Sequence, residues 1–291
     1  MSRGLGVLLL ILVTLIWGTT FVVIKESLNS VPPSLFLALR FSLAALALIW
    51  VRPTKGLWRW GLLLGVVMFL SYGSQTVGLQ FTSASKGAFI TALCVVLVPI
   101  LSGIVNRRWL PLRVWLAAGL ALLGLGLMTL TDVGGINRGD LIIIGTAFAY
   151  ACHVLLIDRA IKSQPPLQLA AAQLWPVAAI CWLWALPEVQ RIPELPLNIW
   201  LSIGYLSVVA TALALVLQTA AQKVVPPYAA ALVFVLEPVF AAFFGWLLLG
   251  EQLGLVGWIG GILVLIGTFI GEIKLPERRR SLADKPVTTS E

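Results

Sequence analysis

The side chain with the clearest potential for chemistry is Glu237, an acid deep in an apolar run and directly before Pro238. A carboxylate at the centre of a bilayer costs about 2.5 to 3.5 kcal/mol on insertion scales, so such a group normally faces protein or water. A functional and a structural role are both open. Glu237 either binds the amine of a solute or carries a coupling proton, or it forms hydrogen bonds that hold helices together.

Arg40 is a second charge inside an apolar run, six residues or about 9 Å along a helix from the nearer end of that run. Its guanidinium would bind a carboxylate and take part in gating, or its long stem would carry the charge to the lipid headgroups. The second interpretation is favoured, because the residue 133 positions later, Gln173, is uncharged.

His153 is the only histidine, and the three cysteines, Cys94, Cys152 and Cys181, each lie within an apolar run. A single histidine without a cysteine or carboxylate at ligand spacing cannot form a zinc site, so we expect no metal and no other cofactor. His153 is then either a hydrogen-bonded interior residue or a step in a proton relay. The same scarcity of paired reactive groups disfavours an integral membrane enzyme.

Neutral polar side chains supply further candidates. Helical spacing places Tyr72, Gln75 and Thr76 on one face of their run, and Gln218 lies in a sparser polar stretch. Such groups either line a solute path or bond neighbouring helices, for a gain near 0.6 kcal/mol each.

Aromatic residues and prolines mark the remaining candidates. Trp17 and Tyr150, which are 133 positions apart, would form paired aromatic walls or simply pack. Pro99 and Pro238 each remove a backbone hydrogen bond, which frees the carbonyl four residues earlier; for Pro238 this is the carbonyl of Phe234. Broken backbone at membrane depth is tolerated only beside protein or a wet cavity, so the prolines indicate gating or structural kinks in cavity walls.

These residues stand out because the chain of 291 residues is 59% hydrophobic and 11% charged, with a mean hydropathy of +0.99. Soluble domains carry about 25% charge, and a helix of about 20 apolar residues crosses a bilayer. The sequence therefore predicts an all-α polytopic membrane protein and excludes nucleic-acid binding. Ten membrane-spanning runs are expected at 5–24, 34–51, 60–79, 87–105, 112–130, 140–157, 167–186, 199–220, 228–249 and 253–273.

Lysines and arginines divide unequally between the two sides of these spans. With a cytoplasmic N-terminus, the cytoplasmic segments carry 15 of the 20 and the outer loops four, with Arg40 inside a span. This asymmetry predicts that both termini of a cytoplasmic membrane protein are cytoplasmic. The basic residues of the polar tail at 274–291 would contact anionic lipid.

The two halves of the chain share anchors in the same order. The anchors are Trp17-Gly18 with Tyr150-Ala151, Pro32-Pro33 with Pro165-Pro166, and Pro99 with Pro238. Because each half holds five helices, an odd number, the second copy must enter the membrane from the opposite side. We expect inverted repeats at 1–131 and 132–273 around a central cavity, since two such halves can rock about a midplane site.

Three motifs resemble the drug/metabolite transporter superfamily, specifically its EamA-like group, over 5–273. They are Trp17-Gly18, the junction Gly78-Leu79-Gln80-Phe81-Thr82-Ser83-Ala84-Ser85, and Phe234-Val235-Leu236-Glu237-Pro238-Val239 followed by Leu249-Gly250-Glu251. The first half has Arg107-Arg108-Trp109-Leu110 where the second has Leu249-Gly250-Glu251, so no role of Glu251 is duplicated. The resemblance implies ten helices around a central cavity, secondary transport without ATP, and often export of amino acids or related metabolites.

We therefore expect a secondary-active carrier that exports a small organic solute by alternating access, with protons as the candidate coupling ion. The expected substrate-binding residues are Trp17, Tyr72, Gln75, Thr76, Tyr150, Gln218, Phe234 and Glu237. The expected coupling or gating residues are Glu237, Pro99, Pro238, His153 and Arg40. A facilitator or uptake carrier for another class of metabolite is the alternative, ahead of a membrane enzyme or a non-transporting membrane protein.

Overall fold

The computed structural model describes residues 1–129, 136–249 and 254–272, and every regular element within them is helical. In chain order they are α1 (Arg3–Gly18), α2 (Thr20–Ser27), α3 (Pro33–Ala47), α4 (Leu57–Leu79), α5 (Ala84–Ala92), α6 (Cys94–Asn106), α7 (Leu112–Thr129), α8 (Arg138–Ala160), α9 (Pro166–Ala185), η1 (Leu186–Glu194), α10 (Leu197–Ser207), η2 (Val208–Leu213), α11 (Ala214–Gln222), α12 (Pro227–Phe234), α13 (Leu236–Leu249) and α14 (Leu255–Glu272). The all-α prediction is confirmed. The expected boundary between the repeats, the Gly250-Glu251 pair and the tail lie outside the described residues.

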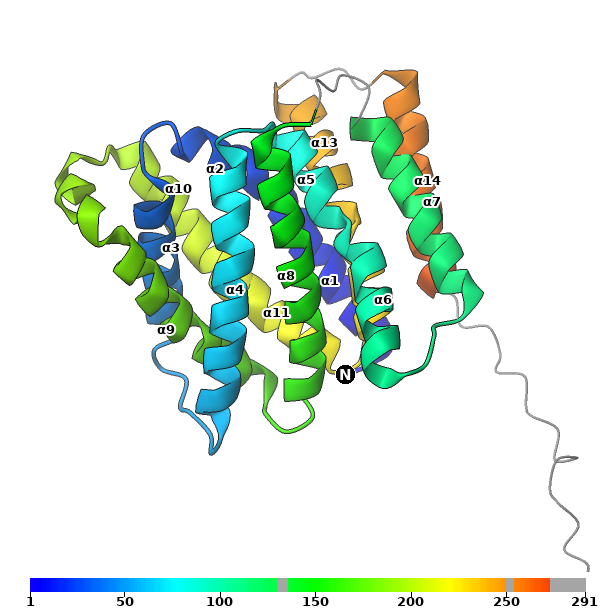
Figure 1. Cartoon of the computed structure of the whole chain (residues 1–291), viewed down its shortest axis with the longest axis horizontal. Coiled ribbons are helices and arrows are strands. Elements are labelled where there is room, and N and C mark those ends of the chain that lie inside the picture. Colours follow the sequence, from blue (N-terminus) through cyan, green and yellow to red (C-terminus); the bar gives the residue numbers. More distant parts are fainter. Residues whose placement is uncertain (130–135, 250–253, 273–291) are drawn as a thin grey trace, which may run out of the picture.

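The described helices match the expected spans one for one. Seven segments are long and apolar enough to cross a membrane, and three shorter apolar helices complete the set: Arg3–Ser27, Leu57–Leu79, Lys86–Asn106, Arg138–Ala160, Pro166–Ile192, Leu197–Gln222 and Pro227–Phe244, with Pro33–Ala47, Leu112–Met128 and Leu255–Gly271. α1 rises from the end of the bundle that holds the N-terminus, whereas α8, which opens the second half, begins at the opposite end (Figure 1). The two five-span halves are therefore inverted relative to each other.

The recurring Pro-Pro pairs begin helices. Pro32 and Pro165 are the N-cap residues of α3 and α9, and each is followed by a proline at the first helical position. A proline is favoured there because its fixed φ suits the helix and its missing N–H has no helical partner to lose. α8 begins differently, with a capping box in which the Asn137 side chain accepts from the Asp140 N–H and the Asp140 carboxylate accepts from the Asn137 N–H.

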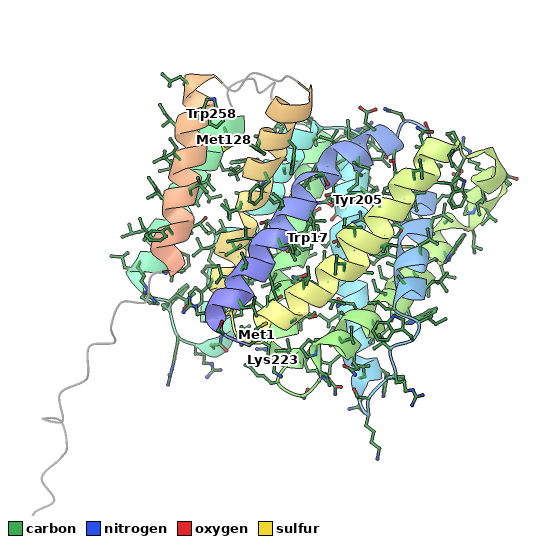
Figure 2. The ribbon with its side chains drawn as sticks, turned by 180° about the vertical axis from the view of Figure 1, so that it is seen from behind. Met1, Trp17, Met128, Tyr205, Lys223 and Trp258 are labelled. Atoms are coloured by element: carbon green, nitrogen blue, oxygen red, sulfur yellow. The ribbon has the colours of Figure 1, made fainter. Side chains whose placement is uncertain are left out.

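The two halves interlock rather than sit side by side. α4 packs against α8 and α9, and α3 packs against α9. α1 packs against α11 and α13, and Figure 2 shows α1 crossing this face of the bundle with Trp17 near its centre. Any space at the middle of the bundle is consequently bounded by helices of both halves.

Several membrane-spanning units are interrupted near the middle. The first breaks at Thr19, the fourth at Leu93 and the ninth at Val235. The eighth instead contains a π-helical turn, η2, between α10 and α11. π turns are often found at functional sites, because they free backbone groups and re-aim side chains.

α7 and α14, the fifth helix of each half, form a close pair at one edge of the molecule (Figure 2). A Cβ atom built on Gly124 would lie 2.5 Å from the carbonyl oxygen of Gly260, and one on Gly267 would lie 2.8 Å from that of Ala117. Glycine is required at these two contacts because a side chain would collide with backbone. Gly119 has no such contact, so close packing of these helices does not depend on it.

Candidate functional site: a central polar cavity

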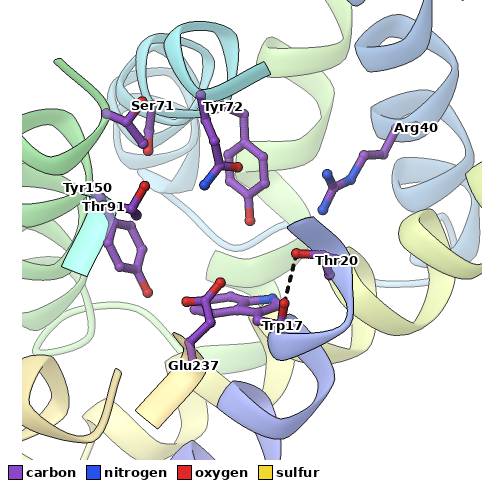
Figure 3. Close-up of a pocket in the computed structure, with 10 residues that line it drawn as sticks. Trp17, Thr20, Arg40, Ser71, Tyr72, Thr91, Tyr150 and Glu237 are labelled. Atoms are coloured by element: carbon purple, nitrogen blue, oxygen red, sulfur yellow. Dashed lines mark hydrogen bonds between the residues drawn. The ribbon is translucent and has the colours of Figure 1, made fainter. Parts of the chain in front are cut away.

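A cavity with a polar and aromatic lining lies between the two halves, near the middle of the bundle (Figure 3). About 30 Å³ of it is open to the centres of water molecules, within about 390 Å³ of space between the lining atoms. Its lining comes from α1, α2, α3, α4, α5, α8 and α13: Trp17, Thr20, Arg40, Ser71, Tyr72, Gln75, Thr91, Thr146, Tyr150 and Glu237. Its free volume is of the size that holds an ordered water molecule.

The Trp17-Gly18 pair builds one wall. The Trp17 indole N–H donates to the carbonyl oxygen of Ala210 at 2.9 Å, which fixes the ring against η2. Gly18 allows α13 to approach, since a Cβ there would lie 2.8 Å from the Phe240 Cβ and 3.2 Å from the Glu237 carbonyl oxygen. The tryptophan thus supplies the wall, and the glycine brings the helix that carries Glu237 next to it.

An aromatic group covers one side of the cavity. The ring centroids of Trp17 and Tyr150 are 6.0 Å apart, and Phe234 lies 5.6 Å from Trp17 and 5.5 Å from Tyr150. These distances suit favourable edge and tilted ring contacts. The Tyr150 hydroxyl is buried and has no hydrogen-bond partner among the described residues, so the wall also offers an unused polar atom.

Arg40 is buried with 1% of its surface exposed, so the expectation that it reaches the lipid headgroups is wrong. Its Nε donates to the Thr211 hydroxyl at 2.9 Å, and its guanidinium carbon lies 4.9 Å from the centre of the Tyr72 ring. The terminal Nη1 has no hydrogen-bond partner in the part of the chain that the structure describes. Depth along the chain does not reveal which face of α3 carries the side chain, and this face points inward.

Glu237 lies in the first turn of α13, because the ninth unit breaks at Val235. Pro238 costs little at this position, since the first turn of a helix has no N–H partners to lose. The positive end of the helix dipole favours a carboxylate at the same place. No ion pair joins Glu237 to Arg40 within the described part of the chain, and Figure 3 shows the two side chains reaching in from different sides.

The remaining candidates lie outside the lining. Within residues 1–129, 136–249 and 254–272, the Thr76 hydroxyl and the Gln218 amide are buried without hydrogen-bond partners. Phe234 packs against Trp17 and Tyr150. Pro99 lies within α6, six residues after the break at Leu93, and Pro238 does not line the cavity. His153 is buried, and its Nε2 lies 2.7 Å from the Gln173 side-chain oxygen.

Four lining residues were missed by the sequence analysis, and all of them carry hydroxyl groups: Thr20, Ser71, Thr91 and Thr146. Helical spacing could have found two of them. Thr20 lies three residues after Trp17, and Thr146 lies four residues before Tyr150, so each shares a helix face with a cavity aromatic.

Comparison with known proteins places this arrangement in a family. A curated relative from Archaeoglobus fulgidus, named an uncharacterized transporter, is 31% identical and aligns over 91% of this chain and 85% of its own length. A protein of Salmonella typhimurium named a probable amino-acid metabolite efflux pump is 28% identical over 96% of this chain and 98% of its own.

A solved structure titled only as that of a protein shares the fold, with a TM-score of 0.74 at 17% identity over 91% of this chain and 97% of that one. The model of the EamA-like transporter family matches residues 4–130 and 137–271. The chain therefore belongs to the EamA-like transporter family.

Proposed function

We propose that this protein is a secondary-active carrier that exports small organic metabolites, with amino acids and related compounds as its substrates. The observation that carries the proposal is the central cavity, where a guanidinium, a carboxylate and aromatic rings face one small space. An amino acid carries charges of both signs beside an apolar group, so each part of it has a complementary wall. The relatives named amino-acid metabolite efflux pumps support the same class of substrate.

Alternating access would work through repeats at 1–131 and 132–273 that rock about the cavity. Support comes from a group of residues at the end of the bundle opposite the N-terminus, termed here the polar end cluster: Lys25, Thr82, Lys86, Asn137 and Asp140. Lys86 pairs with Asp140 at 2.5 Å, and the Thr82 hydroxyl donates to the same carboxylate. These contacts tie α5 to α8, and thus one half to the other, so opening at this end must break them.

Both termini would be cytoplasmic, in the cytoplasmic membrane. The loops after α3, α6 and α8, which carry the basic residues, lie at the N-terminal end of the bundle (Figure 1). Trp50, Trp58 and Trp109 are exposed close to these loops, as interfacial indoles are. With this orientation the polar end cluster faces outside, and substrate would leave through it.

Glu237 would carry the coupling proton, because among the described residues it is the carboxylate that lines the cavity. Its place at the start of α13, beside Trp17 and across from Arg40, would let one carboxylate respond both to a proton and to the amine of a substrate. Pro99 and Pro238 would serve the same cycle as fixed bends beside the breaks at Leu93 and Val235.

Counterflow in proteoliposomes tests the function. Purified protein would be reconstituted and assayed with a panel of labelled amino acids and other metabolites, with and without an imposed pH gradient. We expect saturable amino-acid counterflow, and we expect Glu237→Gln to lower it while Glu26→Gln, which alters an exposed carboxylate, does not. Counterflow of a different metabolite class alone would indicate the alternative carrier, and none with any solute would contradict transport.

A further inference from the structure

We infer that Arg40 is the residue that binds the carboxylate of the substrate, and that this contact makes the carrier select free acids over amides and amines. The inference deepens the proposed function and rests on it. Its starting point is a charged side chain, almost wholly buried, with an unpartnered nitrogen in the wall of a cavity.

A guanidinium cannot lose its charge in a protein, so Arg40 must be compensated by its surroundings. The described residues compensate it only in part. Its Nε donates to the Thr211 hydroxyl, and its face lies over the Tyr72 ring, while Nη1 has no acceptor. A buried charge left in this condition costs stability, and a ligand that supplies an anionic oxygen removes that cost.

The protein holds Arg40 in a fixed orientation for such a ligand. The Thr211 hydroxyl donates its own proton to the Leu206 carbonyl at 2.7 Å, so its oxygen is turned to accept from Arg40. This bond skips five residues because Thr211 lies in the π turn η2. The same turn accepts the Trp17 indole N–H at Ala210, so one irregular turn fixes both the cation and the aromatic wall.

Glu237 decides which anion fits. It lines the same cavity, and the described residues show no ion pair between it and Arg40, so a second negative charge next to Glu237 would be repelled. A phosphate or a dicarboxylate brings that second charge, whereas a zwitterion brings an ammonium group. The carboxylate of an amino acid at Arg40, with its ammonium group toward Glu237, leaves the cavity with no net change in charge.

The test compares three amino acids with their carboxamides: L-leucine, L-phenylalanine and L-threonine, each against its amide. Purified full-length protein is examined for ligand-induced thermal stabilisation, and the same compounds are used as competitors in counterflow. For wild type we expect the acid to bind about 10- to 100-fold more tightly than its amide, the range typical of hydrogen bonds to a charged group.

Variants separate recognition from structure. Arg40→Gln should bring the acid-to-amide ratio close to one, whereas Arg40→Lys, which keeps the charge, should retain part of it. Thr211→Val should lower the ratio several-fold by freeing the guanidinium to turn. A purely structural role for Arg40 would weaken acid and amide equally.

The outcomes are distinct for the two proposals. Counterflow of amino acids with an unchanged acid-to-amide ratio in Arg40→Gln overturns this inference and leaves the carrier function standing. Failure of all three acids to bind also overturns it, and absence of any counterflow overturns the proposed function as well. If Arg40→Gln does not fold, the ratio in Arg40→Lys and Thr211→Val decides.

Discussion

Two positions in the first half of the chain, Thr20 and Arg40, correspond by the offset of 133 to His153 and Gln173 in the second half. In the second half, the two residues, His153 and Gln173, form a hydrogen bond with each other. His153 Nε2 lies 2.7 Å from the Gln173 side-chain oxygen, and the Gln173 amide donates to the Leu169 carbonyl. Arg40 instead donates to Thr211 of the other half, and its Nη1 has no partner among the residues that the structure describes.

The difference shows how two repeats with the same fold can place different side chains at equivalent positions of one site. Both halves have polar side chains at these two positions. In the second half, His153 and Gln173 bond to each other. In the first half, Arg40 Nη1 has no partner among the described residues and is available to a ligand. Because Arg40 has no charged counterpart at Gln173, a zwitterionic substrate bound as proposed would have a single favourable orientation in the cavity. Near-symmetric architecture therefore coexists with an asymmetric site.

The most disruptive way to break this comparison is Gln173→Arg, which gives the second half a cation. Gln173 is fully buried, and we expect the free energy of unfolding to fall by about 3 kcal/mol, the cost of an uncompensated charge at membrane depth. Thermal unfolding of the purified protein measures this. Gln173→Leu, which loses the hydrogen bond without adding charge, is the control, and equal stability of the two variants would contradict the charge argument.

The reverse change, Arg40→Met, should stabilise the fold by about 2 kcal/mol while it weakens amino-acid binding. Replacing a poorly compensated buried charge with an apolar side chain of similar volume favours the folded state. The Thr211 hydroxyl keeps its hydrogen bond to the Leu206 carbonyl in this variant. Melting temperature and binding are measured on the same sample. A loss of stability would indicate that Arg40 is held for structure.

His153→Leu tests the hydrogen bond between His153 and Gln173. It leaves the Gln173 side-chain oxygen buried without its partner, which should lower the free energy of unfolding by about 1.5 kcal/mol. Because neither residue lines the cavity, the preference for acid over amide should stay as in wild type. A changed preference with unchanged stability would place His153 in the substrate path.

The smallest effect is expected from Trp17→Phe. This variant keeps an aromatic wall but removes the indole N–H that bonds to the Ala210 carbonyl, at a cost near 1 kcal/mol. Affinity for an aromatic substrate measured by thermal stabilisation should fall several-fold at most. A loss as large as that of Arg40→Gln would mean that the wall, and not the cation, dominates binding.

The spans could be predicted from the sequence because their apolar runs are long. Pro99 and Pro238 also indicate broken backbone in the fourth and ninth units, which the structure interrupts at Leu93 and Val235. The break at Thr19 and the turn η2 have no proline beside them, and η2 is bonded to a distant helix by the hydrogen bond from Trp17 to Ala210, which no local pattern predicts. Glu237 illustrates the consequence. In the sequence it is an acid in the middle of a span, and the break at Val235 shows that it lies in the first turn of a helix.

The residues of the candidate site also fall into those that the sequence indicates and those that it does not. Tyr72, Gln75 and Glu237 stand out because polar side chains are rare in apolar runs, and they line the cavity. Serine and threonine do not stand out by their rarity, and only their helical spacing from a cavity aromatic indicates Thr20 and Thr146. Thr91, for example, donates to the Gly87 carbonyl of its own helix, so a serine or threonine can lie in a membrane helix at little cost whether or not it faces a cavity.

The pairing of α7 with α14 has a consequence for synthesis. α7 packs most closely on the last described helix, with Gly124 against Gly260, although more than a hundred residues separate them in the chain. At ordinary translation speeds the wait is on the order of ten seconds. Throughout that interval the glycine face of α7 lies in the bilayer without its partner, so the first half completes its packing only when the ribosome has nearly reached the end of the chain.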